Sequence, residues 1–128
     1  MKGCDSMKRD LDLIRDILLI IEDKSIPGSP LRNSEFEKLN TNLETFFYHL
    51  QLLADAGFIE ANLQEGCTGF LAFQVFRLTN DGCEYLDSVR DPKIYESIKK
   101  KTASLANSVS LEIVKQIGTS LILTKLNL

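Results

Sequence analysis

The chain has little of what most catalytic and metal-binding sites are built from. Its 128 residues include one histidine, three cysteines and no tryptophan. Cys4, Cys67 and Cys83 lie far apart and form no Cys-x-x-Cys pair, which argues against a structural zinc site and against a disulfide framework. We therefore expect three ordinary packing or surface cysteines in a reducing compartment.

Long hydrophobic runs are missing too. No apolar stretch reaches the roughly 18 residues that a membrane-spanning helix requires, and residues 1–10 lack the apolar centre of a signal peptide. We expect a cytoplasmic protein with no membrane partner. Hydrophobic residues at 44% and charged residues at 26% are ordinary values for one globular domain.

Positive charge is scarce. Fifteen Lys and Arg stand against eighteen Asp and Glu, and the isoelectric point is about 5.2. Proteins that bind nucleic acids usually present a basic patch on a basic domain. The net charge thus weakens a DNA-binding hypothesis without excluding it, because the local distribution of charge matters more than the total.

Recurrent catalytic patterns are absent. The chain has no glycine-rich phosphate loop, no cluster of metal ligands, and no Ser-His-Asp or Cys-His arrangement at a suggestive spacing. The one histidine, His49, falls at the edge of an apolar helix face, where we expect it to pack its ring and bond a backbone carbonyl. A pH switch and a partner contact are its alternative roles. We predict a protein that is not an enzyme and needs no cofactor or metal.

What is present is a series of amphipathic segments. Apolar spacing predicts helices over residues 7–23, 43–56, 80–90, 92–105 and 109–126, and alternation predicts strands over 58–63 and 70–78. Asn42, Thr79 and Asp91 are suitable N-caps, and Gly57 is a suitable C-cap. Residues 29–39 fit either a short strand or a single helical turn, and we favour the strand.

A helix followed at once by a hairpin is typical of a recognition helix and its wing. The predicted fold is therefore α+β and mainly helical: a winged helix-turn-helix with a two-stranded β-hairpin wing and additional C-terminal helices. We expect an N-terminal extension over residues 1–6, a winged-helix domain over 7–90, and a C-terminal helical extension over 91–128.

Four segments resemble a known family in the order of the family's own sequence: residues 7–19, 48–61, 77–87 and 110–114. It is a bacterial and phage winged-helix family of unknown function, whose members open on Met-Lys-Arg-Asp-x-Asp-Leu-Ile-Arg. The resemblance implies the winged-helix fold and an origin among phages, prophages and other mobile elements, and it supplies no catalytic residues. Asn80 and Cys83 stand where that family often carries tryptophan and histidine, so an activity that needs those groups would be missing here.

The predicted recognition helix gives the first candidate surface. Its outward face consists of Glu44, Thr45, Tyr48, Leu52 and Asp55. In a DNA-reading winged helix this face enters the major groove, but here it carries no arginine or lysine and two acidic residues. Exposed Tyr48 and Leu52 suit a protein partner better than a groove of DNA, and ordinary solvated surface is the remaining interpretation.

Two further surfaces follow the hairpin. Possible phosphate contacts come from a basic cluster on the next helices, formed by Arg90, Lys93, Lys99, Lys100 and Lys101. The alternative is a solvated helix end that complements the helix dipole. The last helix carries more apolar residues than one face needs, and we expect a homodimer interface there, formed by Leu121, Ile122, Leu123 and Leu126. Full absorption of that helix by the core is the alternative.

Two functions remain after these exclusions. The first is a DNA-binding, transcription-regulatory protein of phage or mobile-element type, which the order of elements and the resemblance favour. The second is a winged-helix module for protein–protein interaction without DNA binding, which the charge favours. From the sequence we rank DNA-linked regulation narrowly first.

Overall fold

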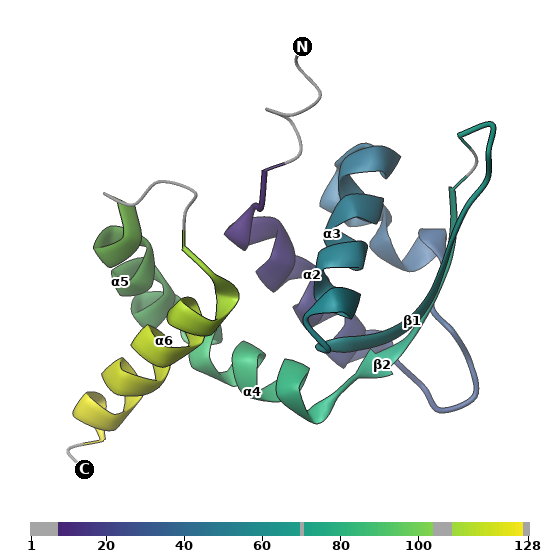
Figure 1. The fold of residues 1–128 in the computed structure, drawn as a ribbon. Coiled ribbons are helices and arrows are strands. Elements are labelled where there is room, and N and C mark those ends of the chain that lie inside the picture. Colours follow the sequence, from purple (N-terminus) through teal and green to yellow (C-terminus); the bar gives the residue numbers. More distant parts are fainter. Residues whose placement is uncertain (1–7, 70, 104–108, 127–128) are drawn as a thin grey trace. The chain divides into compact units, whose positions relative to one another are not determined.

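The computed structural model describes residues 8–69, 71–103 and 109–126 of the chain (Figure 1). The fold is mainly helical with one antiparallel hairpin, which confirms the predicted α+β class. In chain order the elements are α2 (Leu11–Lys24), the 3-10 helix η1 (Asn33–Leu39), α3 (Leu43–Asp55), β1 (Ile59–Glu65), β2 (Leu71–Leu78), α4 (Asn80–Val89), α5 (Pro92–Thr102) and α6 (Leu111–Lys125).

The chain forms two compact units, Met1–Gly82 and Cys83–Leu128. We call them unit 1 and unit 2. The boundary between them falls inside α4, whereas the domains expected from the sequence meet at residues 90 and 91. The functional division into a winged-helix domain and a helical extension stays a prediction.

Helix α2 begins four residues later than the apolar spacing predicts. Asp10 is the N-cap, and its carboxylate accepts hydrogen bonds from the backbone N–H groups of Asp12 (3.0 Å) and Leu13 (3.2 Å). The capping carboxylate fixes the first turn, because it satisfies donors that have no carbonyl partner inside the helix. The expected start at Met7 lies outside the described residues. The buried side chains of this helix are Leu13, Ile14, Ile17, Leu18, Ile20 and Ile21.

Residues 29–39 contain both of the structures that the sequence left open. Leu31 forms an isolated antiparallel bridge with Val75, in which each backbone N–H donates to the other carbonyl at 2.7 and 3.1 Å. Ser29 forms a second isolated bridge, with Ile26. The chain then turns into η1, so the favoured strand is wrong from Asn33 to Leu39. The Glu35 carboxylate accepts a hydrogen bond from the Arg32 backbone N–H at 2.8 Å, which begins the helix and lowers the pKa of Glu35.

The hairpin packs against α3 and extends unit 1's core (Figure 1). Strands β1 and β2 pair antiparallel, with a bulge between Glu60 and Ala61. Three aromatic rings join the hairpin to the helices: Phe73 lies 5.2 Å from Phe46 and 6.1 Å from Phe36 between ring centroids, in edge-on geometry. This cluster holds the hairpin, η1 and α3 together.

In unit 2 the predicted start signals act as expected. Asp91 caps α5 by accepting from the backbone N–H groups of Lys93 and Ile94, with proline at the first helical position. Ser110 caps α6. The expected ends of these segments at Leu105 and at residues 107–108 lie outside the described residues. Helix α6 approaches α4 closely, because a Cβ on Gly118 would stand 2.2 Å from the carbonyl oxygen of Ser88.

Candidate interaction surfaces

Helix α3 carries the predicted recognition surface and is fixed at both ends. The Asn42 side chain accepts a hydrogen bond from the Thr45 backbone N–H at 2.7 Å. At the other end Gly57 adopts a left-handed backbone with φ of 78°, as expected of a C-cap residue. The helix buries Phe46, Phe47, His49, Leu50 and Leu53, which leaves the predicted face directed outward.

The predicted face is less exposed at its centre than the helical spacing suggests. Glu44 and Asp55 are exposed at its two ends, while Tyr48 and Leu52 are half-buried. The expectation of an exposed Tyr48 is therefore only partly right. A helical wheel shows which side of the helix a residue lies on, but not how a long side chain bends over its neighbours. The Tyr48 ring packs edge-on against the ring of His49, and this contact covers part of it. The surface has acidic ends and a partly apolar centre.

His49 is a structural residue of unit 1. It is fully buried, and its two ring nitrogens contact the backbone on both sides. Its Nδ1 lies 2.8 Å from the Thr45 carbonyl oxygen, as the sequence led us to expect, and its Nε2 accepts a hydrogen bond from the Asp10 backbone N–H at 2.9 Å. An acceptor at Nε2 leaves the proton on Nδ1. The ring thereby ties α3 to the start of α2, a contact that the sequence did not reveal.

The basic cluster of unit 2 does not form one continuous face. Arg90 pairs with Asp87 at 2.9 Å, and the Lys99 ammonium lies 5.4 Å from the centre of the Tyr95 ring. Lys93, Lys100 and Lys101 are exposed. Because successive residues of a helix are about 100° apart, Lys93 and Lys100 share one side of α5, whereas Lys99 and Lys101 point to either side of it.

The predicted dimer residues of α6 differ in exposure. Leu121 and Ile122 are half-buried, while 45% of Leu123 and 61% of Leu126 is exposed. Ile113, which the sequence analysis did not select, is 43% exposed on the same helix. The excess apolar surface is thus present, but it is spread along α6 rather than gathered at its end.

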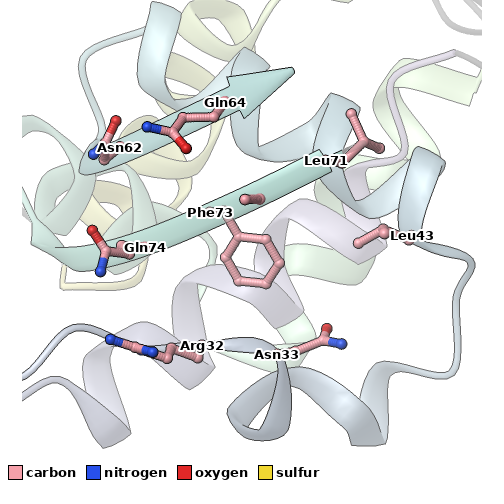
Figure 2. A pocket seen from close by; sticks show the side chains of 9 residues that line it. Arg32, Asn33, Leu43, Asn62, Gln64, Leu71, Phe73 and Gln74 are labelled. Atoms are coloured by element: carbon pink, nitrogen blue, oxygen red, sulfur yellow. The ribbon is translucent and has the colours of Figure 1, made fainter. Parts of the chain in front are cut away.

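The sequence did not predict a groove that runs along the edge of β2, with a volume of about 440 Å³ (Figure 2). We call it the β2 groove. One guanidinium and four amides form its polar lining: Arg32, Asn33, Asn62, Gln64 and Gln74. Its apolar lining consists of Leu43, Leu71, Ala72 and Phe73. Its volume falls within the range of ligand-binding pockets, roughly 300–1,000 Å³.

The backbone of β2 also contributes to this groove. Val75 directs its N–H and C=O to Leu31 and therefore away from β1. Because these directions alternate along a strand, Leu71 and Phe73 direct theirs to the same free edge. No hydrogen bond to those groups is found among the described residues. Asn62 and Gln74 form a cross-strand pair of amides, and these two polar residues were the feature of the groove that the sequence offered. They could not be assigned to a groove without knowing that Leu31 pairs with Val75.

The described ranges contain neither a metal-binding cluster nor a membrane-spanning helix. Within residues 8–69, 71–103 and 109–126, no group of three or more His, Cys, Asp or Glu side chains is arranged to hold a metal ion. None of the helices in those ranges is long and apolar enough to cross a membrane. Cys67 and Cys83 are exposed thiols, and Cys4 lies outside the described residues.

Comparison with known proteins identifies one family. The model of a family described as "Hypothetical protein (DUF2513)" matches residues 8–109. An uncharacterized protein of Haemophilus influenzae is 34% identical over 116 residues, which cover 91% of this chain and 96% of that protein. The match spans both units and agrees with the resemblance found in the sequence.

Proposed function

The chain belongs to the DUF2513 family of hypothetical proteins, and within that family we propose that it is a winged-helix module that binds a protein partner rather than DNA. The order of elements in unit 1 supports the winged-helix assignment. Helix α2 is followed by the isolated bridge at Leu31, the 3-10 helix η1, helix α3 and the hairpin, which takes the place of a wing after a recognition helix.

The distribution of charge is the observation that carries the choice of a protein partner. Residues 8–82 contain seven Lys and Arg but twelve Asp and Glu. Helix α3 has no lysine or arginine, and its exposed ends are Glu44 and Asp55. A surface that neutralises phosphates must present positive charge, whereas a half-buried Tyr48 and Leu52 between polar ends fit the composition of a protein interface.

DNA-linked regulation is the second candidate, and one observation favours it. Residues 83–128 contain seven Lys and Arg against five Asp and Glu, and three of the lysines lie together at the end of α5. Binding through this part of the chain would be a non-standard use of the fold. We also propose that the protein has no catalytic role, since no site described above combines a nucleophile, a base and an orienting group.

Fluorescence anisotropy tests the DNA candidate. Labelled fragments of host DNA and of the gene's own upstream region are titrated with the full chain at about 50 and 200 mM salt. We expect no binding that weakens steeply with salt. Tight, salt-sensitive binding that is lost when Lys93, Lys100 and Lys101 are replaced by glutamine would overturn the preference for a protein partner.

Site-specific photo-crosslinking tests the protein partner directly. A photoreactive phenylalanine analogue replaces Tyr48 on α3, and a control protein carries it in place of the exposed Ile26, which follows α2. In cells that produce the protein, we expect one discrete protein adduct from position 48 and none of that mass from position 26. Adducts to nucleic acid, or no adduct from position 48, would contradict the proposal.

A further inference from the structure

We propose that the β2 groove binds an extended peptide of a partner protein, which adds a strand to β2 and sets an acidic residue against Arg32. The inference rests on the proposed function and names the chemistry of the partner. An added strand is a common way to recognise a peptide, because main-chain hydrogen bonds supply affinity and alternate side chains supply specificity.

The free edge of β2 supplies the main-chain contacts. Leu71 and Phe73 each direct one N–H and one C=O into the groove, so a strand lying there can form four backbone hydrogen bonds. Leu31 already bonds Val75 in this manner at 2.7 and 3.1 Å, which demonstrates that this edge accepts an antiparallel neighbour. After Leu31 the chain leaves the edge to enter η1, and the remaining positions are open to another segment.

The residues that line the groove determine which side chains the peptide can carry. Phe73 is held in place by the rings of Phe36 and Phe46, and with Leu43 and Leu71 it forms a fixed apolar floor. Since side chains alternate along a strand, every second residue of the peptide meets this floor. Four amides on the rim offer both donors and acceptors to the backbone of a peptide. An apolar ligand would leave these amides without hydrogen-bond partners.

The charge of the groove selects an acidic residue. Among the described residues that line the groove, Arg32 is the single charged one, and it follows Leu31 directly. A peptide strand that runs beside Phe73 is stopped at Val75 by Leu31, so the end of the peptide comes to the side of Arg32. A guanidinium there pairs with a carboxylate in bidentate geometry. One positive charge within an acidic unit does not suit a nucleic-acid strand, which needs a charged track.

The experiment begins with a defined probe. A phage-displayed library of random heptapeptides is selected on the full chain, and one enriched peptide is synthesised with a fluorescent label for polarisation titrations. We expect enriched peptides with alternating apolar residues and an acidic residue at one end. An enrichment no higher than on the bare support would overturn the inference.

Two substitutions at one position isolate the backbone contact. Leu71→Ala and Leu71→Pro both remove the leucine side chain, but only proline removes the N–H that faces the groove. Proline is tolerated at the first residue of a strand, which is the place of Leu71 in β2. We expect binding to Leu71→Pro to be about tenfold weaker than binding to Leu71→Ala, at equal circular dichroism and thermal stability. Equal affinity for the two folded variants would refute strand addition.

A charge reversal tests the acidic residue independently. Selection on Arg32→Glu should enrich peptides with lysine or arginine in place of the acidic residue, an exchange that a merely structural arginine would not produce. The same acidic preference on both proteins would refute the role of Arg32. If position 48 gives a protein crosslink but the library gives no peptide, this inference fails while the proposed function stands. If position 48 gives no protein crosslink, the proposed function fails, whether or not a peptide is selected.

Discussion

Replacement of His49 by phenylalanine should destabilise unit 1, because it removes the acceptor of the part-buried Asp10 N–H and the contact with the Thr45 carbonyl. The ring of His49 is fully buried, and phenylalanine keeps a ring there while removing both nitrogens. The Asp10 N–H then loses its acceptor at 2.9 Å, which costs roughly 1–3 kcal/mol. The Thr45 carbonyl also accepts the helical bond from the backbone, so losing its contact with Nδ1 costs only about 0.5–1.5 kcal/mol. The total is about 2–4 kcal/mol.

Thermal and urea unfolding measure this cost. At roughly 3–4 °C per kcal/mol, the Tm should fall by about 6–16 °C. His49→Gln is the matched variant, because its amide oxygen can occupy the place of Nε2 and keep the bond to Asp10. We expect it to lose less than half as much stability, and Tyr48→Phe to lose under about 0.5 kcal/mol. If glutamine and phenylalanine at position 49 were equally destabilising, the bond to Asp10 would not be the cause.

Three further predictions concern unit 2. Gly118→Ala should destabilise by about 1–3 kcal/mol in urea unfolding despite its better helix propensity, because its Cβ would meet the Ser88 carbonyl oxygen at 2.2 Å; an unchanged midpoint would contradict that contact. The pKa of Asp91 is lowered, first by its hydrogen bond to Lys125, so its stabilisation is complete above about pH 4 and disappears as pH falls through the folded-state pKa. In Asp91→Asn the free energy of unfolding should therefore fall less steeply below about pH 4 than in the parent protein. An equally steep fall in the variant would exclude Asp91 as a source of the acid sensitivity. We propose a dimer through α6, so Leu123→Glu should halve the molar mass measured by light scattering; a monomeric parent protein, or an unchanged mass in the variant, would refute it.

Local chemistry explains why most of the elements could be predicted. Asn42, Gly57 and Asp91 act within a few residues of themselves, and each takes the capping role expected of it. The error at 29–39 has a different origin. Leu31 is extended because Val75 lies opposite it, and no local pattern reports a partner so far along the chain. The Glu35 carboxylate accepts a hydrogen bond from the Arg32 backbone N–H and so stabilises the start of η1, and the strand prediction did not take this short-range bond into account.

The candidate surfaces also divide into features that depend on local sequence, which could be predicted, and features that depend on distant residues, which could not. Helical spacing placed Glu44 and Asp55 on an outward face, because direction on a single helix follows from sequence alone. It misjudged the depth of Tyr48, since depth depends on what packs nearby. The β2 groove was missed altogether, because its amide residues come from three segments, and the bridge at Leu31 brings the segment of Arg32 and Asn33 to the same groove as β1 and β2.

The bridge between Leu31 and Val75 also sets a delay during protein synthesis. A ribosome adds about 5–20 residues per second, so Val75 is made roughly two to nine seconds after Leu31. Throughout that interval the first helix of the nascent chain has been completed, while the strand that closes its core does not yet exist. Unit 1 therefore cannot complete its core before the hairpin has been made, and slower translation lengthens the time for which the apolar side chains of α2 lack these contacts.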